Sequence, residues 1–124
     1  MIIGIGLEIV DIDTWELAIA SKGAPWIQSV FTIDERKYCQ GQEDPYAKLA
    51  GIFAAKQAVL KALAKTRTEE SDFHEVEILC NDGKTTISLK GKLLELRAHM
   101  ALTRCFVSIT QTSNYAVAVV VPEA

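Results

Sequence analysis

Apolar residues recur at intervals of three and four through the middle of the chain. Leu49, Ile52, Phe53 and Leu60 all follow this spacing, which places them on one face of a helix. The pattern predicts a long helix from about residue 46 to residue 64, with its apolar face in the core. The same helix carries lysines among its apolar residues.

The regions on either side of this helix have the patterns of strands and short helices. Residues 2–12 are mostly apolar and include Gly4 and Gly6, which predicts a buried strand. An Asn-Asp-Gly turn at 81–83 predicts a hairpin. The expected strands are 2–12, 75–80, 85–89, 104–110 and 115–121, and the expected shorter helices are 14–22, 32–39 and 91–102. We therefore predict an α+β fold in which a small, mostly antiparallel sheet packs on one long helix.

Composition and charge narrow the class of protein. The 124 residues suffice for one domain, 49% of them are hydrophobic, and the net charge is −3. We expect a soluble, cytoplasmic protein with one domain over 1–124 and no signal peptide or membrane span. The acidity argues against nucleic acid as a partner. Cys39, Cys80 and Cys105 form no CxxC pair, so neither a disulfide framework nor a zinc site is indicated.

Several charged residues lie within the expected strands and helices, and each has more than one possible role. Glu8 interrupts the first strand. Because an unpaired buried carboxylate is costly, Glu8 is either part of a polar site or close to a partly exposed strand end. Taken alone, Lys56 and Lys61 are most often surface lysines with their stems on apolar surface. Glu35 follows Thr32 at the spacing of a capping box, so its role is either helix capping or catalysis.

Four segments, taken in order, resemble a known enzyme family. They read GIGLEI at 4–9, FTIDERKYC at 31–39, LAGIFAAKQAVLKAL at 49–63 and VSITQT at 107–112. These motifs resemble the holo-acyl-carrier-protein synthase group of the 4′-phosphopantetheinyl transferases, from residue 1 to about residue 121. The resemblance implies the fold of that family and a homotrimer with sites between its subunits. It also implies transfer of the phosphopantetheine arm of CoA to a serine of an acyl or peptidyl carrier protein.

The resemblance implies roles for individual residues. The family holds Mg²⁺ with two carboxylates, and Glu8 and Gln57 stand where it usually has aspartate and glutamate. Gln57 and Lys61, four residues apart, project from the same face of the helix, where Glu8 could meet them. The catalytic candidates are Glu8, Gln57, Lys61 and Glu35, the metal candidates are Glu8 and Gln57, and the candidates for contact with CoA are Lys56, Lys61, Ser108 and Gln111.

Departures from the family pattern weaken the expected site. Gln57 is neutral, so one negative side chain replaces two, and Mg²⁺ should bind less well. Ile52 replaces an arginine that would face a phosphate or a partner. Gln111 replaces a histidine and cannot transfer a proton near neutral pH. The stretch 64–72 lacks the family's glycines, and 11–20 lacks the cation that would face a carrier protein.

Two main hypotheses follow. In the first, the protein is a diverged homologue with weak or lost transfer that still binds CoA, a carrier protein or another partner. In the second, it is a working Mg²⁺-dependent transferase dedicated to one carrier protein. New chemistry in the same pocket is a third alternative. A basic surface formed by Arg36, Lys37 and Lys48 would favour docking of an acidic carrier protein.

Overall fold

A computed structural model describes residues 1–63, 70–81 and 83–124. One strand, five consecutive helices, a hairpin, a sixth helix and two further strands follow in order among the described residues, in a mixed α+β fold, as predicted. The elements are β1 (Gly6–Asp11), α1 (Ile12–Lys22), α2 (Ala24–Val30), α3 (Ile33–Gln40), α4 (Pro45–Ala62), α5 (Glu70–Glu75), β2 (Val76–Asn81), β3 (Lys84–Leu89), α6 (Gly91–His99), β4 (Arg104–Gln111) and β5 (Tyr115–Glu123). None of the described helices is long and apolar enough to cross a membrane.

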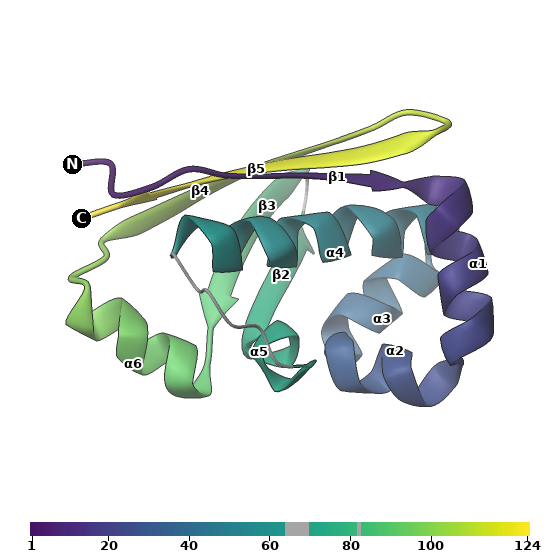
Figure 1. Cartoon of the computed structure of the whole chain (residues 1–124), viewed down its shortest axis with the longest axis horizontal. Helices are drawn as coiled ribbons and strands as arrows, with labels where there is room; N and C mark the ends of the chain where they lie inside the picture. The colour runs from purple at the N-terminus through teal and green to yellow at the C-terminus, as the bar shows by residue number, and fades with distance from the viewer. Residues whose placement is uncertain (64–69, 82) are drawn as a thin grey trace.

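The strands form one sheet of three strands and one hairpin. The larger sheet is antiparallel with the order β1-β5-β4, so β1 and β4 are its edges. The hairpin pairs β2 with β3. In Figure 1 the described helices all lie on one side of the larger sheet, and α4 runs directly beneath it. This arrangement confirms the predicted antiparallel sheet on one long helix.

Two glycines allow β1 to lie directly against α4. A Cβ atom at Gly6 would overlap the carbonyl oxygen of Ala58, and one at Gly4 would overlap that of Ala62. Backbone cannot move aside as a flexible side chain can, so both positions require glycine. Glu8 follows on the same inward-facing side of the strand and is therefore carried to the surface of α4.

The core surrounds α4, which is buried on nearly every side. Its small residues, among them Ala50, Ala54 and Ala58, are fully buried and let the sheet and the other helices approach closely. At the end nearest α1, Trp15 packs against Phe53 with 4.8 Å between ring centroids. The predicted apolar stripe of the long helix is therefore core, as expected.

The opposite face of the larger sheet is apolar but exposed. Side chains alternate along β1, so Leu7 and Ile9 point away from α4, beside their partners Val119 and Val117 on β5. Phe106 on β4 is exposed as well. The described helices leave this face uncovered (Figure 1). A contiguous exposed apolar surface of this kind is typical of an interaction face.

Two short helices were not predicted. The first helix ends at Lys22, as expected, but α2 begins two residues later with Pro25 in its first turn, where proline is well tolerated. Gly23 separates the two helices with a φ of 79°, a conformation that glycine adopts freely. The second missed helix, α5, starts in a polar stretch that has no apolar periodicity.

Candidate functional site

Glu8 and Lys61 form an ion pair at the contact between β1 and α4. Glu8 Oε1 accepts a hydrogen bond from the Lys61 ammonium, and the side chains are 16% and 61% exposed, respectively. Gln57, one turn earlier on α4, is half-buried. The predicted meeting of Glu8 with Lys61 is thus confirmed. The chemical roles of these three residues remain predictions.

The unequal burial of this pair decides what it can do. Glu8 is mostly buried, and its partner offsets the cost of desolvating the carboxylate. Lys61 is mostly in solvent, where an ion pair contributes at most about 1 kcal/mol. The exposed ammonium is therefore accessible to a second anion, such as a diphosphate, while it remains beside Glu8.

The side chains at this centre do not fit Mg²⁺ on their own. Mg²⁺ prefers several oxygen ligands and tolerates little deviation from octahedral geometry. Glu8 and Gln57 offer one carboxylate and one neutral amide, and Lys61 already neutralises that carboxylate. Within 1–63, 70–81 and 83–124, no three histidines, cysteines or carboxylates come together as a metal site would require.

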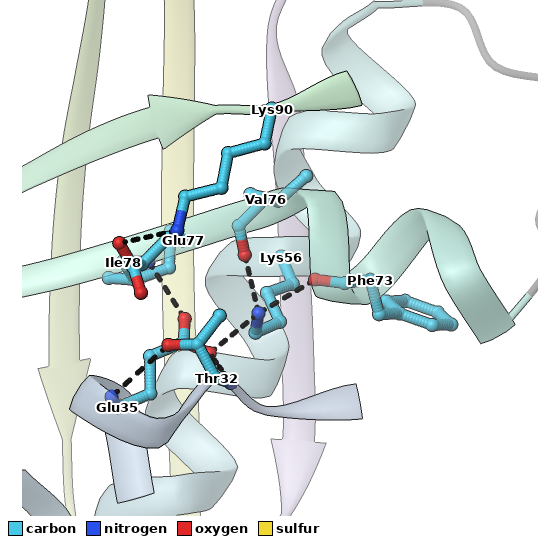
Figure 2. A network of polar contacts seen from close by, with 8 residues as sticks. All are labelled: Thr32, Glu35, Lys56, Phe73, Val76, Glu77, Ile78 and Lys90. Atoms are coloured by element: carbon cyan, nitrogen blue, oxygen red, sulfur yellow. Dashed lines mark hydrogen bonds and ion pairs between the residues drawn. The ribbon is translucent and has the colours of Figure 1, made fainter. Parts of the chain in front are cut away.

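A second ion pair, between Glu35 and Lys56, lies in the core (Figure 2). The two side chains are 2.8 Å apart and 0% exposed. Glu35 Oε1 also accepts the backbone N–H of Thr32, and Oε2 accepts that of Ile78, each at 2.8 Å. The Lys56 ammonium donates to the carbonyl of Phe73 at 2.7 Å and to that of Val76.

This network corrects two of the interpretations drawn from the sequence. Lys56 is not a surface lysine, and its burial disagrees with the prediction that it faces a phosphate, since Glu35 and two carbonyls already accept its three N–H groups. Burial lowers the pKa of Lys56, and the charge of Glu35 opposes this shift. Glu35 completes a capping box with Thr32, so the capping interpretation is confirmed, and its burial gives no access for catalysis.

A cavity of about 340 Å³ lies between α3, α4, the β2–β3 hairpin and β4. Ile52 and Gln111, the two positions at which the family pattern has arginine and histidine, line it together. Gly51 allows β4 to approach α4 here, because a Cβ atom would lie 3.1 Å from Ile109 Cγ2. Lys48 also lines this cavity. Sequence reasoning did not place Lys48 there, although its position four residues before Ile52 was the available signal.

The remaining site candidates are separated. Ser108 is exposed on the outer face of β4, whereas Gln111 points to the inner face, because side chains alternate along a strand. Of the three residues expected to form a basic surface, Arg36 lines a different cavity from Lys48, beside His74 and Lys90. Of the acidic residues on the first helix, Asp13 and Glu16 are exposed.

Comparison with known proteins identifies the family. Residues 4–120 match the model of the 4′-phosphopantetheinyl transferase superfamily. A holo-[acyl-carrier-protein] synthase of Geobacter metallireducens is 40% identical over 125 residues, which cover 99% of this chain and 98% of that protein. One from Leptospira biflexa is 35% identical over 120 residues, with coverage of 96% and 94%.

Solved structures agree with this match. The holo-[acyl-carrier-protein] synthase of Neisseria meningitidis superposes with a TM-score of 0.90 at 25% identity, over 100% of both chains. That of Helicobacter pylori in complex with coenzyme A gives a TM-score of 0.82 at 25% identity, over 96% of this chain and 99% of that one. Sequence and fold therefore agree over almost the whole chain, and the protein belongs to the 4′-phosphopantetheinyl transferase superfamily.

Proposed function

We propose that this protein binds CoA and an acyl carrier protein, and that it transfers 4′-phosphopantetheine more weakly than a site with two carboxylates would. In this reaction the serine oxygen of the carrier forms a bond to the β-phosphate of CoA. The bond to the departing 3′,5′-ADP breaks with its electron pair, and the serine loses its proton. Similarity to holo-[acyl-carrier-protein] synthases over 99% of the chain supports the reaction class. The CoA complexes of two structural neighbours support CoA as the ligand.

The observation that carries the proposal is the pairing of Glu8 with Lys61. Phosphoryl transfer depends mainly on positioning the groups and neutralising charge. Lys61 is exposed, and Glu8 is its one ion-pair partner among the described residues, so its ammonium is accessible to a diphosphate. Glu8, Gln57 and Lys61 together carry no net charge, whereas two carboxylates with a lysine would carry −1. The centre therefore attracts a divalent cation less than the family's usual site does, and we expect slow transfer.

The outer face of the larger sheet supports self-association. The exposed apolar face around Leu7 and Ile9 offers a surface on which copies can meet. We propose a homotrimer, as the family resemblance implies.

Intact-protein mass spectrometry tests the transfer. Purified protein is incubated with CoA, Mg²⁺ and a panel of apo-carrier proteins, beside the variants Gln57→Glu and Gln57→Glu with Glu8→Asp. We expect a slow gain of one phosphopantetheine mass with the unaltered protein and faster gain with the variants. If the carrier proteins gain mass with the variants but not with the unaltered protein, only the proposed binding of CoA and a carrier protein remains. If no carrier protein gains mass with any of the three proteins, the proposed transfer is wrong.

The exposed acidic residues on α1 favour a second candidate, an active Mg²⁺-dependent transferase dedicated to one carrier protein. Carrier proteins of the usual acidic kind would be repelled by Asp13 and Glu16, so a carrier with a less acidic docking surface is indicated. The same panel decides between the two candidates. Rapid transfer to one carrier alone, at ordinary Mg²⁺ concentration and without Gln57→Glu, would favour the dedicated enzyme.

A further inference from the structure

The fold brings together two of the three cysteines, which lie far apart in the sequence. Cys39 is on α3 and Cys80 is on β2, and both are free thiols. The contact between these two elements includes a hydrogen bond in which Glu35 Oε2 accepts the backbone N–H of Ile78 at 2.8 Å. Cys39 lies one helical turn after Glu35, and Cys80 lies two residues after Ile78, so each occupies the next equivalent position along its element. The cysteines are therefore neighbours if α3 and β2 run in the same direction.

The surroundings of Cys39 show that the two elements do run in the same direction. Tyr38, which precedes Cys39 on α3, lines the same cavity as Cys80. Burial raises the pKa of Tyr38, and the Cys80 and Cys39 thiols raise it further, so both thiols lie near its hydroxyl. Burial also raises the pKa of Cys39 to about 12, and the Cys80 thiol is the next cause of this rise. Cys39 and Cys80 thus lie close to each other where α3 meets the hairpin.

The two thiols differ in their access to solvent. Cys39 is 1% exposed and belongs to the core. Cys80 is half-buried and lines the cavity, and the Thr85 hydroxyl donates a hydrogen bond to its sulfur at 3.9 Å. A small reagent in solution therefore reaches Cys80 first. Cys39 is positioned to react next, with a group that is already attached to Cys80.

We propose that Cys39 and Cys80 form a reversible disulfide bond when the protein meets a low-molecular-weight disulfide such as glutathione disulfide. The Cys80 thiol loses its proton, its sulfur bonds to one glutathione sulfur, and the other glutathione leaves as a thiolate with the electron pair of the broken S–S bond. The Cys39 thiol then loses its proton, its sulfur bonds to the Cys80 sulfur, and the second glutathione leaves in the same way. Two protein thiols are oxidised, and one glutathione disulfide is reduced to two glutathione molecules.

The high pKa of Cys39 does not prevent the second step. The Cys39 thiolate is scarce at neutral pH because of burial and because a charge on Cys80 opposes a second charge nearby. Once Cys80 carries glutathione, its sulfur is uncharged, so this second cause disappears. The sulfur to be attacked is also held beside Cys39, and a reacting group held in place acts as though it were highly concentrated. The pair therefore favours the internal bond over retention of glutathione.

The bond would link α3 to β2 in the wall of the cavity. It closes a loop of about 40 residues, and a disulfide stabilises a fold mainly by restricting the unfolded chain. The oxidised protein should therefore unfold at a higher urea concentration than the reduced protein. Cys105 on β4 provides a control thiol, because burial raises its pKa to about 11 but it lines a different cavity, beside Arg97.

Peptide mass spectrometry tests the proposed bond. The folded full chain is incubated at pH 8 with excess glutathione disulfide and then digested without reduction. We expect the wild type to lose two hydrogens, to retain no glutathione, and to give a linked pair of peptides that contain Cys39 and Cys80. Dithiothreitol should reverse the change, and Cys105→Ala should behave as the wild type does. Cys39→Ala should stop with one glutathione on Cys80, whereas Cys80→Ala should leave Cys39 unmodified.

Several results would overturn the inference. They are a wild type that does not react, one that retains glutathione on Cys80, a linked peptide that contains Cys105, and a bond that forms only in urea. Because Cys39→Ala removes a sulfur from the core, circular dichroism checks its fold, and the linked peptides of the wild type do not depend on that variant. Neither CoA nor a carrier protein takes part in these measurements, so their outcome is independent of the proposed transfer.

Discussion

The carboxylate of Glu35 and the ammonium of Lys56 lie 2.8 Å apart with no exposure to solvent. Through backbone groups of Thr32, Phe73, Val76 and Ile78, this pair joins the start of α3 and the middle of α4 to α5 and β2 (Figure 2). The hairpin is thereby tied to the helix that carries Gln57 and Lys61. We conclude that this buried pair holds the scaffold of the site and leaves the chemistry to other residues.

Removing one partner of this pair should be costly. Lys56→Met would leave the Glu35 carboxylate buried without its cation, and breaking a buried ion pair in this way typically costs about 3–5 kcal/mol. We expect a loss of that size in the free energy of unfolding, measured by urea titration. Lys61→Met, which removes the exposed ammonium of the other pair, should cost at most about 1 kcal/mol.

A double variant separates the charge from the packing. Combining Lys56→Met with Glu35→Gln removes the unpaired charge, and the one amide oxygen of glutamine can still accept a hydrogen bond from the backbone N–H of Thr32 or of Ile78, though not from both. This combination should recover part of the stability lost in Lys56→Met. If Lys56→Met alone is no less stable than Lys61→Met, the buried pair does not have the structural role assigned to it.

Local features of the sequence predicted much of this architecture. The capping box of Thr32 and Glu35 and the apolar periodicity of α4 depend on residues three or four apart, so both were visible without the fold. The burial of Lys56 was not visible, because Glu35 lies far away in sequence and its other partners are backbone carbonyls. The cavity that Lys48 lines was not visible either, because it depends on how the hairpin packs against α4.

The glycine at position 6 should be intolerant of any side chain. Gly6→Ala would place a Cβ atom against the carbonyl of Ala58 and force β1 away from α4. We expect a loss of about 1–3 kcal/mol in the free energy of unfolding, typical of overpacking. Gly41→Ala is the matched control, because its Cβ atom would lie 3.6 Å from the nearest atom at a φ of −81°.

The same substitution should also affect the site. Because Glu8 follows Gly6 on β1, displacement of the strand would separate Glu8 from Lys61 and slow any transfer to a carrier protein. Transfer is measured by mass gain at a temperature where the variant remains folded. Equal stability of Gly6→Ala and Gly41→Ala would refute the close approach of β1 to α4.

Glu77 should give the protein part of its sensitivity to acid. Burial alone raises the pKa of Glu77, but hydrogen bonds with Thr32 and Lys90 and the charge of Lys90 outweigh burial, so the pKa lies below its usual value. A carboxyl whose pKa is lower in the folded state stabilises the fold above its unfolded pKa, about 4.3. This stabilisation is lost as the pH falls through the folded value.

Urea unfolding at several pH values checks the direction in which folding shifts the pKa of Glu77. The difference in stability between wild type and Glu77→Gln should be constant from pH 7 to about pH 5, and it should shrink at lower pH. Glu16→Gln, which alters an exposed carboxylate on α1, serves as the control. A difference that grows as the pH falls would mean that folding raises the pKa of Glu77.

The apolar outer face of the larger sheet should hold copies of the chain together. Ile9 on this face is 60% exposed in the single chain, and Leu17 on α1 is 73% exposed. Light scattering should give the wild type a mass of about three chains of 13.6 kDa each. Ile9→Lys would place a charge in the apolar interface and should give single chains, whereas Leu17→Lys should leave the assembly intact. A wild type with the mass of one chain, or an assembly that survives Ile9→Lys, would exclude this face as the interface.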